Sequence, residues 1–218
     1  MQTISIIGGT GELGSGLAWR WAKAGLPVII GSRDADRAAT VAAELSAITA
    51  NDSVRGMSNT DAAAAGDIIV LTVKFSHQAT TLEELRPSLT GKIMIDTTVP
   101  LVPPKVARVQ LPPEGSAAVI AQALLGDSVQ VVSAFQNVSA ESLKSETLSE
   151  CDVLVTGNSV AARETVVNLA GKAGLKAWHA GPLQNSAAAE ALTSLLIFMN
   201  KRYKSDHAGL RITGIDND

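Results

Sequence analysis

Short apolar runs alternate with stretches of helical periodicity along the first half of the chain. The apolar runs predict β-strands at residues 3–8, 28–31, 53–56, 67–73 and 92–96. The stretches between them predict helices at residues 12–24, 35–49, 59–65 and 76–89. Continuous apolar strands that alternate with helices are typical of a parallel sheet covered on both faces. The pattern therefore predicts an α/β protein with a doubly wound parallel sheet.

The pattern changes after residue 96. Five prolines fall within fourteen residues, at positions 100, 103, 104, 112 and 113, and proline interrupts a helix because it lacks a backbone donor. Beyond them the pattern predicts helices at residues 116–125, 160–173 and 187–201, and strands at residues 129–134, 152–156 and 176–180. A boundary near residue 130 would divide the chain into a larger domain, residues 1–130, and a smaller C-terminal α/β domain, residues 131–218.

Composition excludes several classes of protein. The chain has 218 residues, of which 46% are hydrophobic, so it can bury a core without disulfides and is not disordered. A formal net charge of −3 argues against a nucleic-acid binder. The single cysteine, Cys151, excludes a disulfide framework and a cysteine-ligated zinc site. No targeting segment is visible and no apolar run reaches the roughly 18 residues of a membrane span, so we expect a cytoplasmic protein without membrane contact.

The clearest motif lies between the first predicted strand and the first predicted helix. Its sequence is GGTGELG at residues 8–14, and the GxGxxG core is formed by Gly9, Gly11 and Gly14. Gly9 allows a tight turn, Gly11 lets a pyrophosphate approach the backbone, and Gly14 lets the helix pack closely on the strand. The helix N-terminus then offers free N–H groups and partial positive charge to phosphates. The motif predicts a Rossmann-type dinucleotide site.

The end of the second predicted strand indicates which dinucleotide binds. An NAD site usually has an acidic residue there, which binds the ribose 2′-hydroxyl, whereas this chain has Ser32 and Arg33. Arg33 can face a 2′-phosphate with paired donors, and Arg37 adds a second positive charge one turn later. Asp34 follows directly, but we expect it to cap the next helix. The residues therefore predict NADP rather than NAD.

Several segments together resemble the NADPH-dependent reductases of coenzyme F420, a deazaflavin. Besides the glycine motif, they are GSR at 31–33, VPL at 99–101, EGSAA at 114–118, SAE at 139–141, AGPL at 180–183 and RYK at 202–204. The resemblance runs nearly from end to end. It implies reversible hydride transfer between NADP(H) and coenzyme F420 as co-substrate, which requires stacked rings and excluded water but no nucleophile or metal.

The resemblance also implies which residues bind each cofactor. NADP contacts are expected from the first loop and from the end of the second strand: Thr10, Gly11, Glu12, Leu13, Ser32, Arg33 and Arg37. The nicotinamide is expected near the ends of later strands, at Val73, Phe75, Val99 and Pro100. A loop at residues 136–140 would border the deazaflavin, with apolar surface from Val138 and Ala140 and a polar group from Gln136 or Asn137. The smaller domain would complete this pocket and form a homodimer interface.

Two departures from the family pattern leave other functions open. Lys74 and Phe75 stand where archaeal members tend to have Trp after Pro or a small residue, and Gln136 stands where many have His. A neutral amide can hydrogen-bond a ring carbonyl but cannot become a cation near neutral pH. One alternative is therefore an NADPH-dependent reductase of a flavin, quinone or imine. The other is an NADP(H)-sensing module without turnover.

Overall fold

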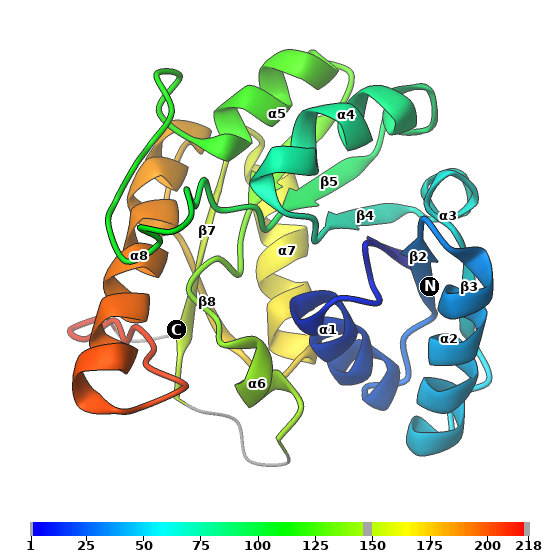
Figure 1. Ribbon diagram of the computed structural model, residues 1–218. Coiled ribbons are helices and arrows are strands. Elements are labelled where there is room, and N and C mark those ends of the chain that lie inside the picture. The colour runs from blue at the N-terminus through cyan, green and yellow to red at the C-terminus, as the bar shows by residue number, and fades with distance from the viewer. Residues whose placement is uncertain (1, 146–149, 216–218) are drawn as a thin grey trace.

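The computed structural model describes residues 2–145 and 150–215. In this part of the chain, eight strands form one sheet in the order β3-β2-β1-β4-β5-β6-β7-β8 (Figure 1). Neighbouring strands are parallel except β6 and β7, which are antiparallel. The strands are β1 (Ile4–Ile7), β2 (Val28–Ser32), β3 (Val54–Ser58), β4 (Ile68–Leu71), β5 (Ile93–Asp96), β6 (Gln130–Ser133), β7 (Asp152–Gly157) and β8 (Lys176–His179).

Helices connect most of these strands and cover both faces of the sheet. They are α1 (Glu12–Lys23), α2 (Ala35–Thr49), α3 (Asn59–Ala65), α4 (Phe75–Leu85), α5 (Ala117–Leu125), α6 (Ala140–Leu143), α7 (Val160–Lys172) and α8 (Ser186–Tyr203), with short 3₁₀ turns at Arg86–Ser88 and Leu183–Asn185. The predicted doubly wound sheet is confirmed, and each of the eight strands overlaps its predicted range. The α4 helix is shorter than predicted because Pro87 has no N–H to donate to the carbonyl of Glu83.

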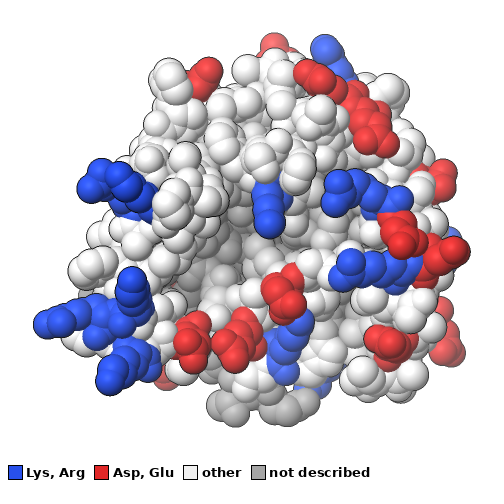
Figure 2. All heavy atoms as spheres, in the orientation of Figure 1, with Lys and Arg blue, Asp and Glu red and all other residues white. Residues whose placement is uncertain are grey.

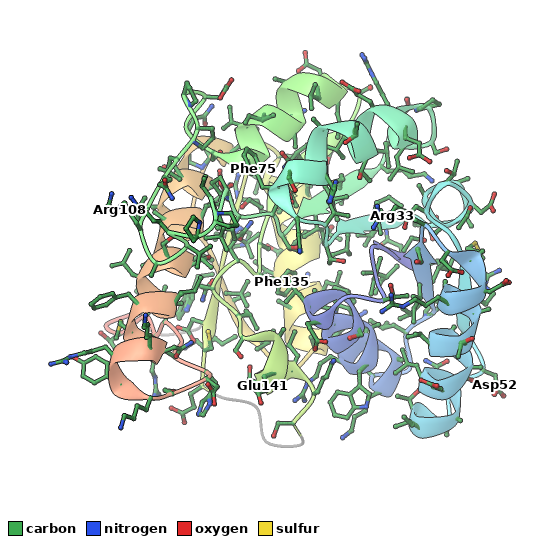
Figure 3. The ribbon with its side chains drawn as sticks, in the orientation of Figure 1. Arg33, Asp52, Phe75, Arg108, Phe135 and Glu141 are labelled. Atoms are coloured by element: carbon green, nitrogen blue, oxygen red, sulfur yellow. The ribbon has the colours of Figure 1, made fainter. Side chains whose placement is uncertain are left out.

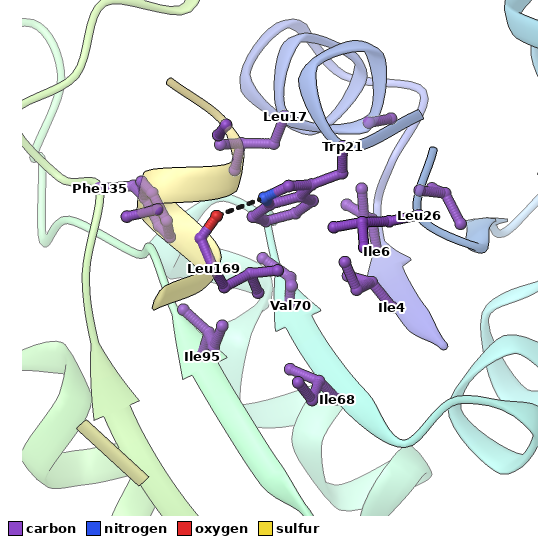
Figure 4. Packing of buried hydrophobic residues seen from close by; sticks show 14 of the residues in the cluster. Ile4, Ile6, Leu17, Trp21, Leu26, Ile68, Val70, Ile95, Phe135 and Leu169 are labelled. Atoms are coloured by element: carbon purple, nitrogen blue, oxygen red, sulfur yellow. Dashed lines mark hydrogen bonds between the residues drawn. The ribbon is translucent and has the colours of Figure 1, made fainter. Parts of the chain in front are cut away.

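Each face of the sheet carries its own apolar core. On one face, α1, α2 and α7 pack against alternate strand residues, and the indole of Trp21 is fully buried (Figure 4). The Trp21 Nε1 donates a hydrogen bond to the carbonyl of Leu169, at 2.9 Å, so the one polar group of this side chain is satisfied. On the other face, α3, α4 and α5 cover the remaining strand residues with small aliphatic side chains. Burial on both faces explains why the strands read as continuous apolar runs.

The strand order places a crevice beside β1. The chain runs outward from β1 to β2 and β3, and then returns to the other side of β1 with β4. In open α/β sheets, ligands bind outside the carboxyl ends of the strands at such a reversal of order. The loops that follow β1 and β4 therefore form the expected binding edge.

The sheet continues across the predicted domain boundary at residue 130. Strand β6 pairs with β5 over four residues, from the Ile93–Gln130 pair to the Asp96–Ser133 pair. The chain then reverses into β7, and α8 runs beside the loop that follows β5 (Figure 1). The division at residue 130 stays a prediction, and both parts share one sheet. No helix in the described ranges is both long and apolar enough to span a membrane.

Candidate functional site

The loop between β1 and α1 is a tight turn made by glycine. The N–H of Gly11 donates to the carbonyl of Gly8 at 3.0 Å, and the N–H of Gly9 donates to the carbonyl of Gly31 at 2.9 Å. Gly8 has a φ of +76°, in the left-handed region that favours glycine. The loop is therefore fixed by its own backbone and by the neighbouring strand β2.

Two glycines of the motif leave no room for a side chain. A Cβ on Gly9 would lie 2.8 Å from the carbonyl oxygen of Ile6. A Cβ on Gly14 would lie 2.7 Å from Oγ1 of Thr72 and 2.8 Å from the Cα of Gly9. Gly14 thus lets the first turn of α1 pack directly on the loop and on the residue after β4. Both positions match the packing roles predicted from the motif.

The first turn of α1 has N–H groups that no side chain caps. Its N-cap residue is Gly11, which has no side chain to accept a hydrogen bond. The helices α4, α6 and α8 also begin without a side-chain cap. The remaining helices, α2, α3, α5 and α7, are each capped by a side-chain oxygen, from Asp34, Ser58, Ser116 and Ser159 respectively. An uncapped helix N-terminus of three turns offers donors and partial positive charge to an anion. The loop therefore fits a phosphate group.

The two other predicted contacts in this turn are Glu12 and Leu13. Leu13 is half-buried against the core, and Glu12 is exposed. The carboxylate of Glu12 pairs with Nζ of Lys144, next to α6, at 2.9 Å, and this partner lowers the pKa of Glu12. The negative charge of Glu12 beside the phosphate site is thus balanced by a lysine at the end of α6, which packs against α1.

The end of β2 presents two arginines to solvent. The Oγ of Ser32, which is buried, accepts a hydrogen bond from the N–H of Asp34 at 3.2 Å. The carboxylate of Asp34 accepts from the N–H of Arg37 at 3.0 Å, so its predicted role as a helix cap is confirmed. Arg33 and Arg37 are both exposed (Figure 3 labels Arg33). This strand end therefore carries two cations. Asp34 is turned toward the helix, and a second acid, Asp36, lies in the first turn of α2.

The phosphate loop and the end of β2 line one cavity of about 1020 Å³. It is bounded by the phosphate loop, the end of β2 and the first two turns of α4. The face drawn in Figure 2 is hollowed near its centre, with Lys and Arg side chains on either side of the hollow. The lining residues are Gly8, Thr10, Gly11, Ser32, Arg33, Asp34, Arg37, Asn59, Thr72, Val73, Lys74, His77, Thr80, Thr81 and Glu84. Six residues of the predicted site, Thr10, Gly11, Ser32, Arg33, Arg37 and Val73, are thus brought together.

The predicted nicotinamide neighbours follow β4 and β5. Val73 leads into α4, and Phe75 is the first residue of that helix and is half-buried. Val99 and Pro100 lie a few residues beyond β5, where Val99 is half-buried and Pro100 is buried. Because β4 and β5 are parallel neighbours, these residues lie at the same edge of the sheet. In Figure 3, Phe75 lies toward the middle of the molecule, where α4 begins.

The amide side chains of the loop after β6 point into the fold. Gln136 is 5% exposed, and its Nε2 donates to the carbonyl of Asp96 at 2.8 Å and to Oγ of Ser133 at 2.7 Å. Asn137 is 3% exposed, and its Nδ2 donates to the carbonyl of Asp152 at 2.7 Å. The two residues therefore anchor the loop to β5 and β7, and their donors are used inside the fold. The apolar pair expected beside them differs in exposure: Val138 is buried and Ala140 is half-buried.

A strained residue precedes these amides. Phe135 has a φ of +73°, which is rare for a residue with a side chain. Its ring is fully buried and packs edge-on against Trp21, with ring centroids 6.0 Å apart (Figures 3 and 4). Residues held in sparsely populated backbone regions persist where the surrounding packing fixes them, and they cluster at functional sites. The core residue Trp21 on α1 thus helps set the course of the loop at residues 135–140.

Two buried carboxyl groups lie behind this loop. Asp96 is completely buried, accepts hydrogen bonds from the N–H of Thr98 and from Nε2 of Gln78, and burial raises its pKa. Glu190 on α8 is 1% exposed and accepts from the N–H groups of Ala117 and Ala118 at 2.7 and 3.1 Å. Burial raises the pKa of Glu190 to about 8, and the charge of Asp96 also raises it. Glu190 therefore binds the first turn of α5 to α8.

Several residues of this edge were not predicted from the motif or from the apolar pattern. Asn59, the first residue of α3, accepts a hydrogen bond from the N–H of Gly8 at 3.2 Å and so supports the phosphate loop. Lys74 lines the cavity directly after β4. Lys74 could have been found from the rule that residues after parallel strands line the crevice. Asn59, Asp96 and Glu190 act through contacts between distant segments, for which the sequence carries no local signal.

The strand order, the glycine-rich loop after β1 and the uncapped N-terminus of α1 define a Rossmann-type dinucleotide-binding protein. A family model described as NADP oxidoreductase, coenzyme F420-dependent, matches residues 3–100. F420-dependent NADP reductases of Methanocaldococcus jannaschii and Methanothermobacter thermautotrophicus are 39% and 42% identical to this chain, and the alignments cover 98% and 99% of it and 99% and 96% of those proteins. The chain therefore belongs to the family of F420-dependent NADP oxidoreductases.

A solved structure extends the similarity to the fold. A protein from Arthrobacter sp. FB24, provisionally assigned as an F420-dependent NADP reductase, superposes with a TM-score of 0.82. The match covers 98% of this chain and all of that one, at 23% identity, so it concerns the fold alone. The agreement includes the region beyond β5 as well as the nucleotide-binding half.

Proposed function

We propose that this protein transfers a hydride reversibly between NADP(H) and coenzyme F420. The observation that carries the proposal is similarity over the whole chain to F420-dependent NADP reductases, at 39–42% identity. An NADP-binding module alone would account for similarity in the first hundred residues only. The alignment also spans the loop at residues 135–140 and helix α8, which lie on the other side of the cleft. A shared second ring site explains that extent best.

The reaction places simple demands on the protein. NADPH, the oxidised deazaflavin and one proton give NADP⁺ and the reduced deazaflavin. The hydride carries two electrons and one proton from NADPH, and the second proton comes from the solvent. The cofactors supply this chemistry, and the protein has to hold the rings in line and exclude water. We assign the nicotinamide side to Val73, Phe75, Val99 and Pro100. We assign the deazaflavin side to the backbone of the loop at residues 136–140 with Val138 and Ala140, and we give Gln136 and Asn137 the role of holding that loop in place.

The acceptor can be tested directly with purified protein. The decay of NADPH absorbance is followed with coenzyme F420, with flavin mononucleotide, with a quinone, with a cyclic imine and with no acceptor. We expect turnover with F420 and none with the others. Turnover with another acceptor would support the reductase alternative, and nucleotide binding without turnover would support a sensing module. Either result would refute the proposal.

We also propose that NADP is preferred over NAD because of Arg33 and Arg37. Both are exposed cations on the nucleotide cavity, and Asp34 beside them is turned to cap α2. Arg33→Ala should raise the Michaelis constant for NADPH about 30-fold, as expected for the loss of roughly 2 kcal/mol from a charge-assisted phosphate contact. The Michaelis constant for F420 should change less than twofold. Equal changes in both constants, or tighter binding of NAD than of NADP by the unchanged protein, would contradict the assignment.

We propose that the protein works as a homodimer in the cytoplasm, with α8 at the interface. Leu195, Phe198 and Met199 form one exposed apolar stripe on α8, at 49, 57 and 43% exposure. Such a stripe is typical of a helix that packs against a partner. Light scattering should give twice the chain mass of 22.5 kDa. Phe198→Lys should give the mass of a single chain, whereas Ile48→Lys, at an apolar residue on α2 that is 72% exposed, should leave the dimer intact. A monomer in the unchanged protein would refute the proposal.

A further inference from the structure

Lys74 is an exposed cation at the edge of the nucleotide cavity. It lies between β4 and α4, where it is the N-cap residue of α4, and it lines the cavity together with Thr10 and Arg33. Among the described residues no carboxylate lies within 4.0 Å of its Nζ, and its side chain makes no hydrogen bond to the protein. The charge of Lys74 is therefore available to a ligand.

The backbone beside Lys74 contacts the phosphate loop. A Cβ on Gly8 would lie 3.2 Å from Cγ1 of Val73 and 3.2 Å from the carbonyl oxygen of Thr72. In the sheet, β1 lies between β2 and β4, so the phosphate loop lies between the end of β2 and the end of β4. Arg33 and Arg37 flank this loop on the β2 side, and Lys74 flanks it on the β4 side.

The distribution of charge indicates which phosphate Lys74 meets. NADP carries two anionic groups, the 2′-phosphate on the adenosine ribose and the diphosphate between the two nucleosides. The arginines after β2 are assigned to the 2′-phosphate, and the diphosphate belongs over the uncapped N-terminus of α1. Glu12 in the first turn of α1 is paired with Lys144, so its charge does not neutralise that of Lys74. Glu84, the acid on the same wall as Lys74, is ten residues further along α4, about 15 Å along the helix.

We propose that Lys74 binds the diphosphate of the dinucleotide, opposite the N–H groups of the first turn of α1. The proposal rests on the assignment of this cleft to NADP(H), and it adds a binding residue on the β4 side. A lysine is suited to this role because its ammonium group acts as a mobile point charge with three donors. Since the diphosphate is common to NADP and NAD, the contact strengthens binding of both. Selection between them remains with Arg33 and Arg37.

Titration calorimetry with NADP⁺ and with NAD⁺ distinguishes this role from its alternatives. Lys74→Gln should weaken both nucleotides by the same factor, about tenfold, the loss expected of one charge-assisted hydrogen bond. Lys74→Arg should stay within threefold of the unchanged protein. Affinity should also depend less steeply on salt in Lys74→Gln than in the unchanged protein, because one phosphate contact fewer is screened. As a matched control, Lys172→Gln removes an equally exposed lysine from the end of α7, far from the cavity, and should change nothing.

Each other outcome has a definite reading. Weaker binding of NADP⁺ with unchanged binding of NAD⁺ would place Lys74 on the 2′-phosphate and overturn the proposal. Unchanged binding of both would make Lys74 a solvated surface residue and also overturn it. If the unchanged protein bound neither nucleotide, the proposed function itself would fail. A double variant with Arg33→Ala should show additive losses for NADP⁺, since the two residues serve separate phosphates.

Discussion

Two loops at the same edge of the sheet differ in the burial and hydrogen bonding of their polar groups. In the phosphate loop, residues 8–14, four of the seven residues are glycines, and no side chain caps the amides at its end. Its cations come from neighbouring strand ends and are exposed to solvent. The loop at residues 135–140, which we call the ring loop, is buried over its first four residues, and its amide donors bond to β5, β6 and β7.

The difference reflects what each loop has to recognise. A phosphate brings charge, so its site needs donors that can exchange water for ligand oxygen atoms. A flat ring brings little charge, so its site needs a surface of fixed shape at short range. The ring loop reaches that rigidity with buried polar contacts and a strained Phe135. We therefore expect substitutions in the phosphate loop to act on binding, and substitutions around the ring loop to act first on stability.

The largest effect is expected from Glu190, which lies behind the ring loop. Because burial raises its folded-state pKa to about 8 from an ordinary value of 4.5, the folded protein keeps a proton that the unfolded chain releases between these values. The stability from that proton is complete below about pH 4.5 and is lost as the pH rises through 8, by at most roughly 5 kcal/mol. Thermal unfolding of the unchanged protein should therefore shift to lower temperature between pH 6 and 9.

The substitution Glu190→Gln removes this titration. The variant puts an amide NH2, which cannot accept a hydrogen bond, in place of one of the two oxygens that accept from Ala117 and Ala118, so it starts less stable, but its unfolding temperature should depend less on pH. Glu114→Gln, at an exposed acid in the neighbouring loop, serves as the control and should keep the slope of the unchanged protein. Parallel curves for Glu190→Gln and the unchanged protein would show that Glu190 does not hold this proton.

The next largest effect is expected in the phosphate loop, at Gly14. An alanine there would put a methyl group 2.7 Å from Oγ1 of Thr72 and 2.8 Å from the Cα of Gly9, so the first turn of α1 has to move. Gly14→Ala should weaken NADP⁺ binding about 100-fold, the loss of roughly 3 kcal/mol. Gly171→Ala on α7, where nothing lies within 4 Å of an added Cβ, should leave binding unchanged. If Gly14→Ala binds NADP⁺ within threefold of the unchanged protein, the phosphate loop tolerates this movement of the first turn of α1.

The phosphate side of the site was largely predictable from sequence, because the residues that define it lie close to one another along the chain. The glycine spacing lies within seven residues, Arg33 follows the next strand, and Asp34 caps the helix that it precedes. The eight strands could be predicted for a related reason, since burial on both faces gives each strand an unbroken apolar run. The four-residue helix α6 was not predicted, because a single turn is too short to show a period.

The ring side depends on contacts that no short segment encodes. Gln136 was expected to offer a polar group to the pocket, but whether an amide points outward or inward depends on β5, forty residues earlier in the chain. Glu190 meets Ala117 across 73 positions. The sequence does mark these residues as polar within apolar surroundings. It does not indicate which distant backbone groups satisfy them.

A third prediction tests the structural role of Gln136. Gln136→Leu keeps the size of the side chain but removes the donor to Asp96 and Ser133, so the free energy of unfolding should fall by about 1–3 kcal/mol. The Michaelis constant for F420 should rise severalfold as the ring loop loosens, while the dissociation constant for NADP⁺ stays within twofold. Gln130→Leu, at the exposed start of the preceding strand β6, is the control and should alter neither. A loss of F420 turnover with unchanged stability would instead show that the amide acts on the ring directly.

The smallest effect concerns the ion pair between the first turn of α1 and the residue that follows α6. Glu12 is held by Lys144, beside α6, so its charge is balanced before a diphosphate arrives. Glu12→Gln should therefore change NADP⁺ affinity less than twofold. Lys144→Gln leaves the carboxylate unpaired beside the phosphate site, and it should weaken NADP⁺ two- to threefold at low salt and have almost no effect at physiological salt, where screening is strong. Titrations at both salt concentrations check that Lys144→Gln weakens NADP⁺ binding more than Glu12→Gln does. A larger effect from Glu12→Gln would mean that this carboxylate binds the nucleotide itself.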